Sequence, residues 1–591
     1  MMKEKVSLFD RVLFGKIMTY AKPYRRYYYL VMVAAILLSF FSTLTPYLLK
    51  VAVDDYITPR LYTGLVLFMA IMLGTLLLEV IFQYVFVYYA NWLGQMIVKD
   101  LRGDLFQKLV GFRMAYFDKT AVGRLVTRSV NDIETIASIF SQGLFMIIAD
   151  FLKMGLVVVV MLTINWELSL IVFSVLPVIL YATRLFQRAM KKAFEEVRKE
   201  IANLNTFVQE RISGMKIVQL FNREWQEQQH FEAINTRHKK SWLKTVWFNS
   251  IFFPVAEIST SVTIGLLVWY GGFRSLNGIT ISLGTLFLFI QLAQMLFRPL
   301  RQIADKFNTL QMGMVAAERV FAIIATQSQI EDKGKKTLAV LDGKLTIANL
   351  HFSYVPNEPV INGIDLIVEP GETVAIVGST GAGKSTLINL ISRFYEFDSG
   401  DIQIDDLSIR DYRLNNLRQH VALVQQDVFL FADTIYNNIT LYDSTISRSS
   451  VIAAAKEIGV HDFINSLPGG YDYNVQERGV MLSSGQRQLI AFLRAYIVSP
   501  TLLVLDEATS SVDSFSEELI QNATDKITRG KTSIVIAHRL ATIKNANRIV
   551  VMEKGKIVEM GTHEKLINQK DGVYHNLYQL QFNQEELLLE S

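Results

Sequence analysis

The sequence contains no cysteine, which excludes disulfide bonds, thiolate metal sites and catalysis by a thiol. Only 11 of the 591 residues are proline and no low-complexity run occurs, so large disordered regions are not expected. Charged residues make up 19% of the chain, less than the roughly 25% of ordinary soluble proteins. The net charge of +4 is small for this length, which argues against nucleic acid as a partner.

Apolar residues, by contrast, make up 51% of the sequence, and they form six long runs in its N-terminal part. Each run has about the length, roughly 20 residues, that a helix needs to cross a bilayer. We therefore predict an all-α transmembrane domain over residues 1–325, with helices that continue beyond the membrane. The six predicted spans are residues 28–49, 65–89, 143–164, 168–186, 248–272 and 283–300.

The loops between these spans differ strongly in basic charge. The long loops, 95–142 and 187–247, are rich in lysine and arginine, whereas the short loops carry only Lys50, Arg60 and Arg274. Because basic loops stay in the cytoplasm, both termini and the C-terminal domain are predicted to be cytoplasmic, in a multi-pass protein of the cell (inner) membrane. The N-terminal segment lacks the pattern of a signal peptide, and Leu8–Tyr20 has the spacing of a helix lying on the membrane.

Four ionisable residues fall well inside the predicted spans. Such charges are costly in a bilayer, so each is a candidate for function. Asp150 and Lys153 lie three residues apart on one predicted helix, and we expect them to neutralise each other. Glu79 and Glu257 have no obvious local partner. They either line a cavity for a cationic amphiphile, pair across helices, or face water.

The pattern changes after the sixth span. Residues 326–342 are polar and charged and are predicted to be a linker. From 343 to 580, strands alternate with helices, which is typical of an α/β domain. Residues 581–591 form a polar, acidic tail.

A complete phosphate-binding loop lies between the predicted strand Thr373–Val377 and the predicted helix Ser385–Ser392. Its glycines let backbone N–H groups turn towards phosphates, and the start of the helix adds a favourable dipole. Lys384 is expected to neutralise the β- and γ-phosphates of ATP, and the Ser385 hydroxyl to bind Mg²⁺. The predicted nucleotide contacts here are Gly378, Ser379, Thr380, Gly381, Ala382, Gly383, Lys384, Ser385 and Thr386.

An unbroken apolar strand, Leu502–Leu505, ends in the two carboxylates Asp506 and Glu507. Carboxyl ends of such buried strands are where these sheets bind ligands. Asp506 is therefore predicted to hold Mg²⁺ or its water, and Glu507 to polarise the water that attacks ATP.

A second anion site is predicted at Leu482–Gln488, where a serine and a glycine open a helix that runs to Val498. A generic phosphate-loop protein needs no such site. Together these motifs, in this order and spacing, resemble the ATP-binding cassette (ABC) exporters of the half-transporter type. In that family one six-span membrane domain is fused to one nucleotide-binding domain, and two chains pair. The resemblance covers essentially the whole chain.

The resemblance implies further roles. Tyr354 would stack on adenine, and Gln426 would sense Mg²⁺ and the attacking water. Ser483, Gly485 and Gln486 would close on the γ-phosphate bound to the other subunit. The same family pattern places Glu477 against the membrane domain, Asp513 at the dimer contact and His538 at the γ-phosphate.

The segment Leu482–Gln488 corresponds to the signature of the family. One departure from the family pattern is Ser484, which replaces the first of two glycines in this signature. Since Ser483 and Gly485 are kept, we expect a working site with an altered rate. The sequence leaves open whether the partner is a second copy or a different half-transporter.

The function predicted from the sequence is ATP-driven export or flipping of a hydrophobic or amphipathic drug or lipid, by alternating access in a dimer. The alternative is an ATP-gated channel or a regulatory ABC subunit. An importer is disfavoured because its membrane and nucleotide domains usually lie on separate chains.

Overall fold

The structure is a computed structural model that describes residues 11–276, 281–330, 332–337, 341–506, 514–537 and 539–581. The chain divides into two compact units. The helical unit comprises the described parts of Met1–Val110 and Thr120–Gln327, and the sheet unit those of Gly111–Lys119 and Ser328–Ser591. The short segment 111–119 thus belongs to the sheet unit, although it lies between two helices of the other unit in the sequence.

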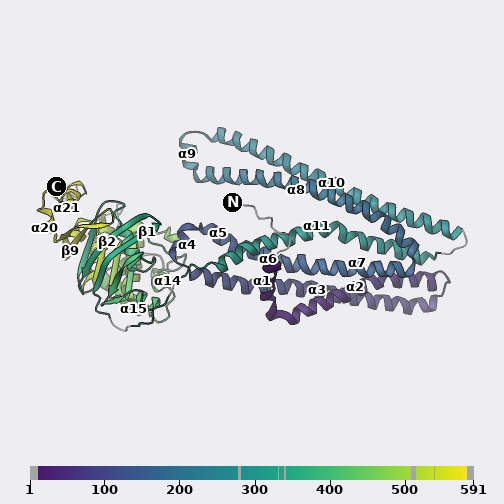
Figure 1. Cartoon of the computed structure of the whole chain (residues 1–591), viewed down its shortest axis with the longest axis horizontal. Helices are drawn as coiled ribbons and strands as arrows, with labels where there is room; N and C mark the ends of the chain where they lie inside the picture. The colour runs from purple at the N-terminus through teal and green to yellow at the C-terminus, as the bar shows by residue number, and fades with distance from the viewer. Residues whose placement is uncertain are drawn as a thin grey trace. The chain divides into compact units, whose positions relative to one another are not determined.

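The helical unit consists of long helices with short connections (Figure 1). Three π-helical turns, labelled η2, η3 and η4, interrupt the α-helices. Its elements are α1 (Arg11–Ala21), η1 (Lys22–Tyr24), α2 (Arg25–Val51), η2 (Ala52–Ile57), α3 (Tyr62–Val110), α5 (Val122–Thr127), η3 (Arg128–Asp132), α6 (Ile133–Ser138), η4 (Ile139–Leu144), α7 (Phe145–Ile164), α8 (Trp166–Ser213), α9 (Met215–Leu220), α10 (Glu224–Leu276) and α11 (Leu283–Ala325).

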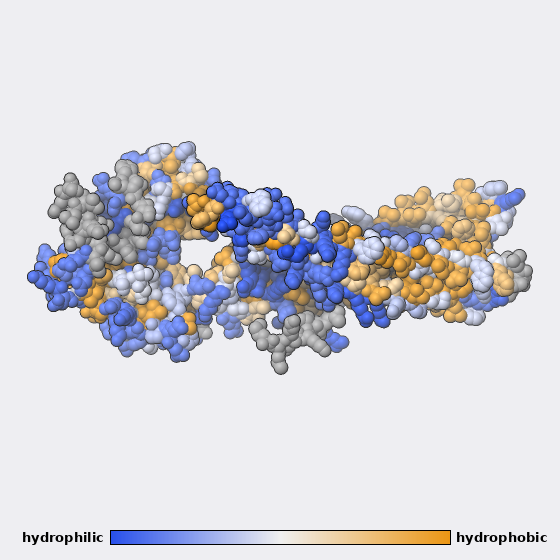
Figure 2. Space-filling view, turned by 90° about the horizontal axis from the view of Figure 1, so that it is seen from above, coloured by the Kyte–Doolittle hydropathy of each residue, from blue (hydrophilic) through white to orange (hydrophobic). Residues whose placement is uncertain are grey.

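Six helical segments in the described chain are long and apolar enough to cross a membrane. The predicted all-α membrane fold is therefore confirmed, and the protein is a multi-pass membrane protein. Figure 2 shows apolar side chains gathered over one end of the helices, drawn at the right, and hydrophilic side chains over their other end. The six segments are Arg11–Ile57, Gly64–Val110, Val122–Ile164, Trp166–Ser213, Glu224–Arg274 and Leu283–Ala325.

Helices α8 and α10 form a long hairpin that ends in the short helix α9. Ion pairs join the two arms: Lys244 Nζ lies 2.8 Å from Glu196 Oε1, and Arg237 Nε lies 3.5 Å from Glu200 Oε2. A turn at 221–223, with Asn222 at φ 49°, leads from α9 into α10. The basic loop 187–247 is thus almost entirely helical.

Asp150 acts electrostatically on Lys153, as expected, but its ion pair is with a different residue. Asp150 of α7 instead forms an ion pair with Lys306 of α11. The spacing of three residues permitted a contact within the helix, but a charged group on a neighbouring helix reaches the carboxylate more directly. The Thr45 hydroxyl of α2 donates a 3.2 Å hydrogen bond to Glu79 Oε2 of α3, so Glu79 also has a partner on another helix.

The sheet unit contains two β-sheets. A four-stranded sheet has the order β2-β1-β4-β5, and a six-stranded sheet has the order β10-β9-β3-β8-β7-β6. In the larger sheet only β10 runs antiparallel to its neighbour. The strands are β1 (Leu345–Val355), β2 (Glu358–Val368), β3 (Thr373–Val377), β4 (Ser399–Ile404), β5 (Leu407–Ser408), β6 (Val421–Val424), β7 (Leu502–Asp506), β8 (Thr532–Ile536), β9 (Arg548–Glu553) and β10 (Lys556–Gly561).

Helices surround these sheets. The mixture of parallel strands and helices confirms the predicted α/β fold class. The helices are α4 (Met114–Lys119), α12 (Lys384–Ile391), α13 (Leu414–His420), α14 (Ile435–Thr440), α15 (Arg448–Ile458), α16 (His461–Ser466), η5 (Gly470–Asp472), η6 (Glu477–Gly479), α17 (Ser484–Ile497), α18 (Ser514–Thr528), α19 (Leu540–Asn545), α20 (His563–Ile567) and α21 (Val573–Gln581).

The six-stranded sheet is buried on both faces, which explains the unbroken apolar runs of its strands. Along β3, Val374 and Ile376 point into one hydrophobic core, and Ala375 and Val377 into another. The first core also takes in α12, through Leu387, whereas the second takes in α17, through Leu489. The helix after the phosphate loop and the helix after the signature are therefore fixed to opposite faces of one sheet.

Candidate functional site

The phosphate loop follows β3 and leads directly into α12. Gly383 ends the loop with φ 101°, a left-handed conformation that favours glycine. At Gly378 a side chain would have no room, because a Cβ atom there would lie 2.2 Å from the Met552 carbonyl oxygen. The backbone of the loop is thus held close to β9 at its start and turns sharply at its end, before the helix begins.

Lys384 is the first residue of α12, and its ammonium group folds back over the loop. Nζ donates hydrogen bonds of 2.6 Å to the Gly378 carbonyl and 3.0 Å to the Ser379 carbonyl. Burial lowers the pKa of this ammonium, and the negative charge of Asp506 acts in the opposite direction. The cation is therefore positioned by the loop and lies within electrostatic reach of the carboxylate that ends β7.

The parallel strands bring the sequence motifs to one edge of the sheet. In the register of the sheet, Asp506 of β7 is opposite Ile536 of β8, and Ile536 is opposite Ile376 of β3. The carboxyl ends of β3, β8 and β7 therefore lie side by side. The phosphate loop follows β3, Ala537 follows β8, and Asp506 is the last residue of β7.

Three of the predicted site residues lie outside the described residues: Glu507, Asp513 and His538. The strand that precedes Glu507 ends at Asp506, and the strand that precedes His538 ends at Ile536. Their predicted roles stay predictions.

Gln426 follows the neighbouring strand β6, whose last residue Val424 is opposite Leu505 of β7. Its side chain is exposed, as is that of Ser385 in the first turn of α12. A hydroxyl, an amide oxygen and the Asp506 carboxylate are the oxygen ligands that Mg²⁺ prefers. The chemistry of these three residues fits a magnesium ion beside the phosphates.

Tyr354, near the end of β1, lies against the first turn of α12. Its hydroxyl donates a 3.3 Å hydrogen bond to Thr386 Oγ1, and its side chain is 39% exposed. The structure thus brings together Tyr354 and the helix that follows the phosphate loop, and it leaves part of the aromatic ring accessible.

The signature opens α17 with a complete capping box. Ser483 Oγ accepts a 3.2 Å hydrogen bond from the Gln486 N–H, and Gln486 Oε1 accepts a 3.0 Å hydrogen bond from the Ser483 N–H. Ser483 and Ser484 are exposed, whereas Gly485 is buried. Ser484, the departure from the family pattern, therefore projects from the surface without disturbing the cap.

The segment before the signature is strained. Gln476 has φ 57° and Arg478 has φ 56°, on either side of Glu477, and neither residue is a glycine. Such conformations cost roughly 1–3 kcal/mol each and persist where the surrounding structure imposes them, often at functional sites. Glu477, which the resemblance assigns to a contact with the membrane domain, lies at this strained turn.

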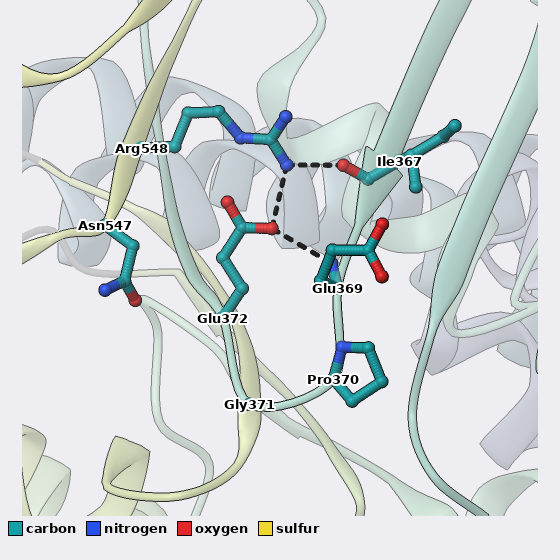
Figure 3. Close-up of a pocket in the computed structure, with 7 residues that line it drawn as sticks. All are labelled: Ile367, Glu369, Pro370, Gly371, Glu372, Asn547 and Arg548. Carbon is teal, nitrogen blue, oxygen red and sulfur yellow. Dashed lines mark hydrogen bonds and ion pairs between the residues drawn. The ribbon is translucent and has the colours of Figure 1, made fainter.

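A separate open pocket of about 540 Å³ lies at the other end of β3 and β9 (Figure 3). There Glu372 Oε2 accepts hydrogen bonds from Arg548 Nη2 at 2.8 Å and from the Glu369 N–H at 2.9 Å. None of the predicted site residues lines this pocket. Its contacts tie the turn between β2 and β3 to the start of β9.

One contact in the sheet unit was not foreseen from the sequence. The Tyr395 hydroxyl, after α12, donates a hydrogen bond to the carboxylate of Asp118 in α4. The two residues are 277 positions apart, so no local pattern could have indicated the pairing.

Comparison with known proteins gives two family matches. Residues 28–300 match the family described as ABC transporter transmembrane region, and residues 361–510 match the family described as ABC transporter. Together the two matches span both units of the structure.

Individual relatives are similar over nearly their whole length. A protein named ATP-dependent lipid A-core flippase, from Syntrophus aciditrophicus, is 35% identical over 97% of this chain and 95% of its own. A Bacillus subtilis protein is 34% identical over 95% of this chain and 98% of its own. It is provisionally named a multidrug export ATP-binding/permease protein. A Streptococcus pneumoniae protein, provisionally named an ABC transporter ATP-binding protein, is 37% identical over 96% of this chain and 97% of its own.

Proposed function

The chain belongs to the ABC exporters, transporters that bind and hydrolyse ATP, and we propose that it exports or flips a hydrophobic or amphipathic molecule as part of a dimer. The observation that carries the proposal is the shared edge of the six-stranded sheet. There the phosphate loop, Asp506 and the end of β8 converge, and Lys384 is held over the loop.

We assign hydrolysis to residues at this edge. Ser385, Asp506 and Gln426 would hold Mg²⁺, which neutralises phosphate charge when bound. Glu507 directly follows Asp506 and would orient and deprotonate the attacking water, and His538 would contact the γ-phosphate. Tyr354 would stack on adenine, since part of its ring is exposed beside the helix that follows the phosphate loop.

The arrangement of the sheet unit supports a partner chain. Ser483 and Ser484 are exposed at the start of α17, and that helix belongs to the core on the opposite face of the sheet from α12. We infer that Ser483, Gly485 and Gln486 complete the site of a second chain, with Asp513 at the contact. ATP held between two chains would then bring them together, and hydrolysis would release them.

Exposed apolar side chains support the same conclusion. No residue of α9 is buried: Ile217 is 58% and Leu220 is 69% exposed. In the sheet unit, Phe429 and Phe431 are 53% and 54% exposed and contact each other edge to face. Exposed apolar surface of this kind is typical of contacts with other protein surfaces, and we propose that α9 and the pair Phe429 and Phe431 each take part in such contacts.

We infer the orientation in the membrane from the distribution of basic charge. The basic loops 95–142 and 187–247 would lie in the cytoplasm with both termini and the sheet unit. The names of two relatives, a lipid A-core flippase and a multidrug export protein, support a drug or lipid as cargo.

Uptake into inverted vesicles tests this function. The expected result is ATP-dependent accumulation of a fluorescent amphipathic dye or a labelled lipid, abolished in Glu507→Gln although that variant still binds ATP. Passive flux without hydrolysis would instead favour a channel. ATPase activity near wild type in Glu507→Gln would contradict its role as the base.

A further inference from the structure

Three aromatic rings pack together beside the proposed adenine position. The ring centroids of Phe352 and Tyr354, both in β1, are 4.8 Å apart, and Tyr395 lies 5.1 Å from Tyr354 and 5.8 Å from Phe352. All three contacts are edge to face, which is a favourable arrangement for aromatic pairs. Phe352 is only 4% exposed and is fixed in the core, so it anchors the other two rings.

Each of the two tyrosine hydroxyls is held by a different element. Tyr354 donates to Thr386 Oγ1 at 3.3 Å, in the helix that follows the phosphate loop. Tyr395 donates to the carboxylate of Asp118 in α4. A continuous series of contacts therefore runs from Thr386 through Tyr354 and Tyr395 to Asp118.

Helix α4 lies at the end of this series of contacts, and in the chain it lies between α3 and α5 of the helical unit. A change in its position would therefore act on the connection between these two helices. The backbone on its N-terminal side is bound to the sheet unit: the Arg113 N–H donates a 2.8 Å hydrogen bond to the Ser328 carbonyl, and Phe112 forms a β-bridge with Gln329. The Asp118 carboxylate is in the last turn of α4. It fixes the other end of this short helix to Tyr395.

We propose that Tyr395 is a positioning residue that couples the base of the bound nucleotide to helix α4 through its hydrogen bond with Asp118. This inference rests on the proposed function, in which Tyr354 contacts adenine. The ligand feature that is sensed is an aromatic base, because the partly exposed ring of Tyr354, on which the base would stack, contacts the ring of Tyr395 directly.

The physical reason is that packed rings do not move independently. A base stacked on Tyr354 restrains its ring, and the ring edge contacts Tyr395. The orientation of Tyr395 in turn sets where its hydroxyl meets Asp118. By thermodynamic reciprocity, a position of α4 that favours the Asp118–Tyr395 bond also favours the nucleotide that orders the rings.

Hydrogen exchange on the full chain in lipid nanodiscs tests this coupling. The probes are ADP, which has a base but no γ-phosphate, and inorganic pyrophosphate, which has no base. ADP is expected to slow amide exchange in residues 111–119 by about fivefold, whereas pyrophosphate leaves it unchanged. In Tyr395→Phe, which keeps the ring but loses the hydroxyl, the ADP effect is expected to disappear although ADP still binds.

Two further variants separate coupling from general damage. Asp118→Ala should behave like Tyr395→Phe, and Asp118→Asn should restore part of the effect, because its amide oxygen still accepts a hydrogen bond. Tyr442→Phe is the matched control, since Tyr442 likewise donates to an acidic residue, Asp433, in the same unit. It should respond to ADP as the wild type does.

An equal ADP effect in wild type and Tyr395→Phe would overturn the proposal, as would an equal effect of pyrophosphate. So would normal ADP binding and ATP hydrolysis with no change in residues 111–119. Failure of the wild type to bind any nucleotide, measured by displacement of a fluorescent ATP analogue, would overturn the proposed function itself.

Discussion

Asp54 Oδ1 accepts a 2.9 Å hydrogen bond from the backbone N–H of Gly284, a residue 230 positions later. The other oxygen of the same carboxylate, Oδ2, accepts a 2.6 Å hydrogen bond from Ser282 Oγ, which in turn caps the start of α11. A Cβ atom at Gly284 would lie 2.5 Å from the Lys50 carbonyl oxygen, so the two segments are in close contact. Asp54 therefore joins the turn η2 to the start of α11, between the first and last membrane helices.

Removing this carboxylate should release the start of α11. In Asp54→Ala the Gly284 N–H loses its acceptor, and we expect amide exchange around residues 284–286 to become about tenfold faster, since a hydrogen bond to a charged group contributes roughly 1.5–3 kcal/mol. Asp55→Ala is the control, because Asp55 is the exposed neighbour. Amide exchange that stays at the wild-type rate in Asp54→Ala would show that the hydrogen bond from Gly284 to Asp54 contributes nothing to the stability of the start of α11.

The ion pair of Asp150 and Lys306 should be important for the stability of the helical unit. Asp150→Asn leaves the lysine charge without its partner in a site where both side chains are mostly buried, and we expect a loss of about 2 kcal/mol. The double variant Asp150→Asn with Lys306→Met should recover most of that loss. Thermal unfolding in detergent measures both. If Lys153→Met destabilises as strongly as Lys306→Met, the pairing of Asp150 lies within its own helix after all.

These two contacts show what the sequence could and could not predict. The strand before Gly378, the strand that ends at Asp506 and the six apolar spans follow from local patterns, because strand and span length are set by neighbouring residues. Partners such as Asp150 with Lys306, Asp54 with Gly284 and Asp118 with Tyr395 are brought together by packing between distant segments. No spacing in the chain encodes them.

The cap at Ser483 allows its structural and chemical roles to be separated. Ser483→Ala loses the cap and should destabilise α17 by about 1 kcal/mol. Ser483→Asp keeps a good cap but adds a negative charge where the γ-phosphate of the partner site would lie. We expect it to fold like wild type and to lose ATPase activity by at least about tenfold, as electrostatic repulsion requires. Wild-type ATPase activity in Ser483→Asp would contradict a phosphate contact at this position.

Tyr412 gives the sheet unit a defined pH dependence. It is fully buried, and its hydroxyl donates a 2.8 Å hydrogen bond to the Ile404 carbonyl. Burial, assisted by the charge of Asp405, raises its pKa from 10.0 to about 12. Below pH 10 both folded and unfolded chains keep the proton. Between about pH 10 and 12 only the unfolded chain releases it, so the free energy of unfolding falls as the pH rises.

Replacement of this tyrosine isolates its contribution. Tyr412→Phe should lower stability below pH 10 through the lost hydrogen bond, and the difference from wild type should shrink by about 1 kcal/mol between pH 9 and pH 11. Urea unfolding of wild type and variant at pH 9 and at pH 11 measures this difference. A difference that is constant or grows with pH would contradict the raised pKa.

The most direct test of the account is whether the ATP site is shared between two chains. Lys384→Ala disables the phosphate loop and Ser483→Arg disables the signature, so each variant alone should be inactive. When the two are co-expressed and mixed dimers form, the Ser483→Arg chain supplies an intact phosphate loop and the Lys384→Ala chain an intact signature. If each site is shared between two chains, one of the two sites in a mixed dimer is therefore fully intact. ATPase activity should then return to roughly a quarter of wild type, since about half of the dimers are mixed. Activity that stays at the level of the single variants would contradict a site completed by a second chain.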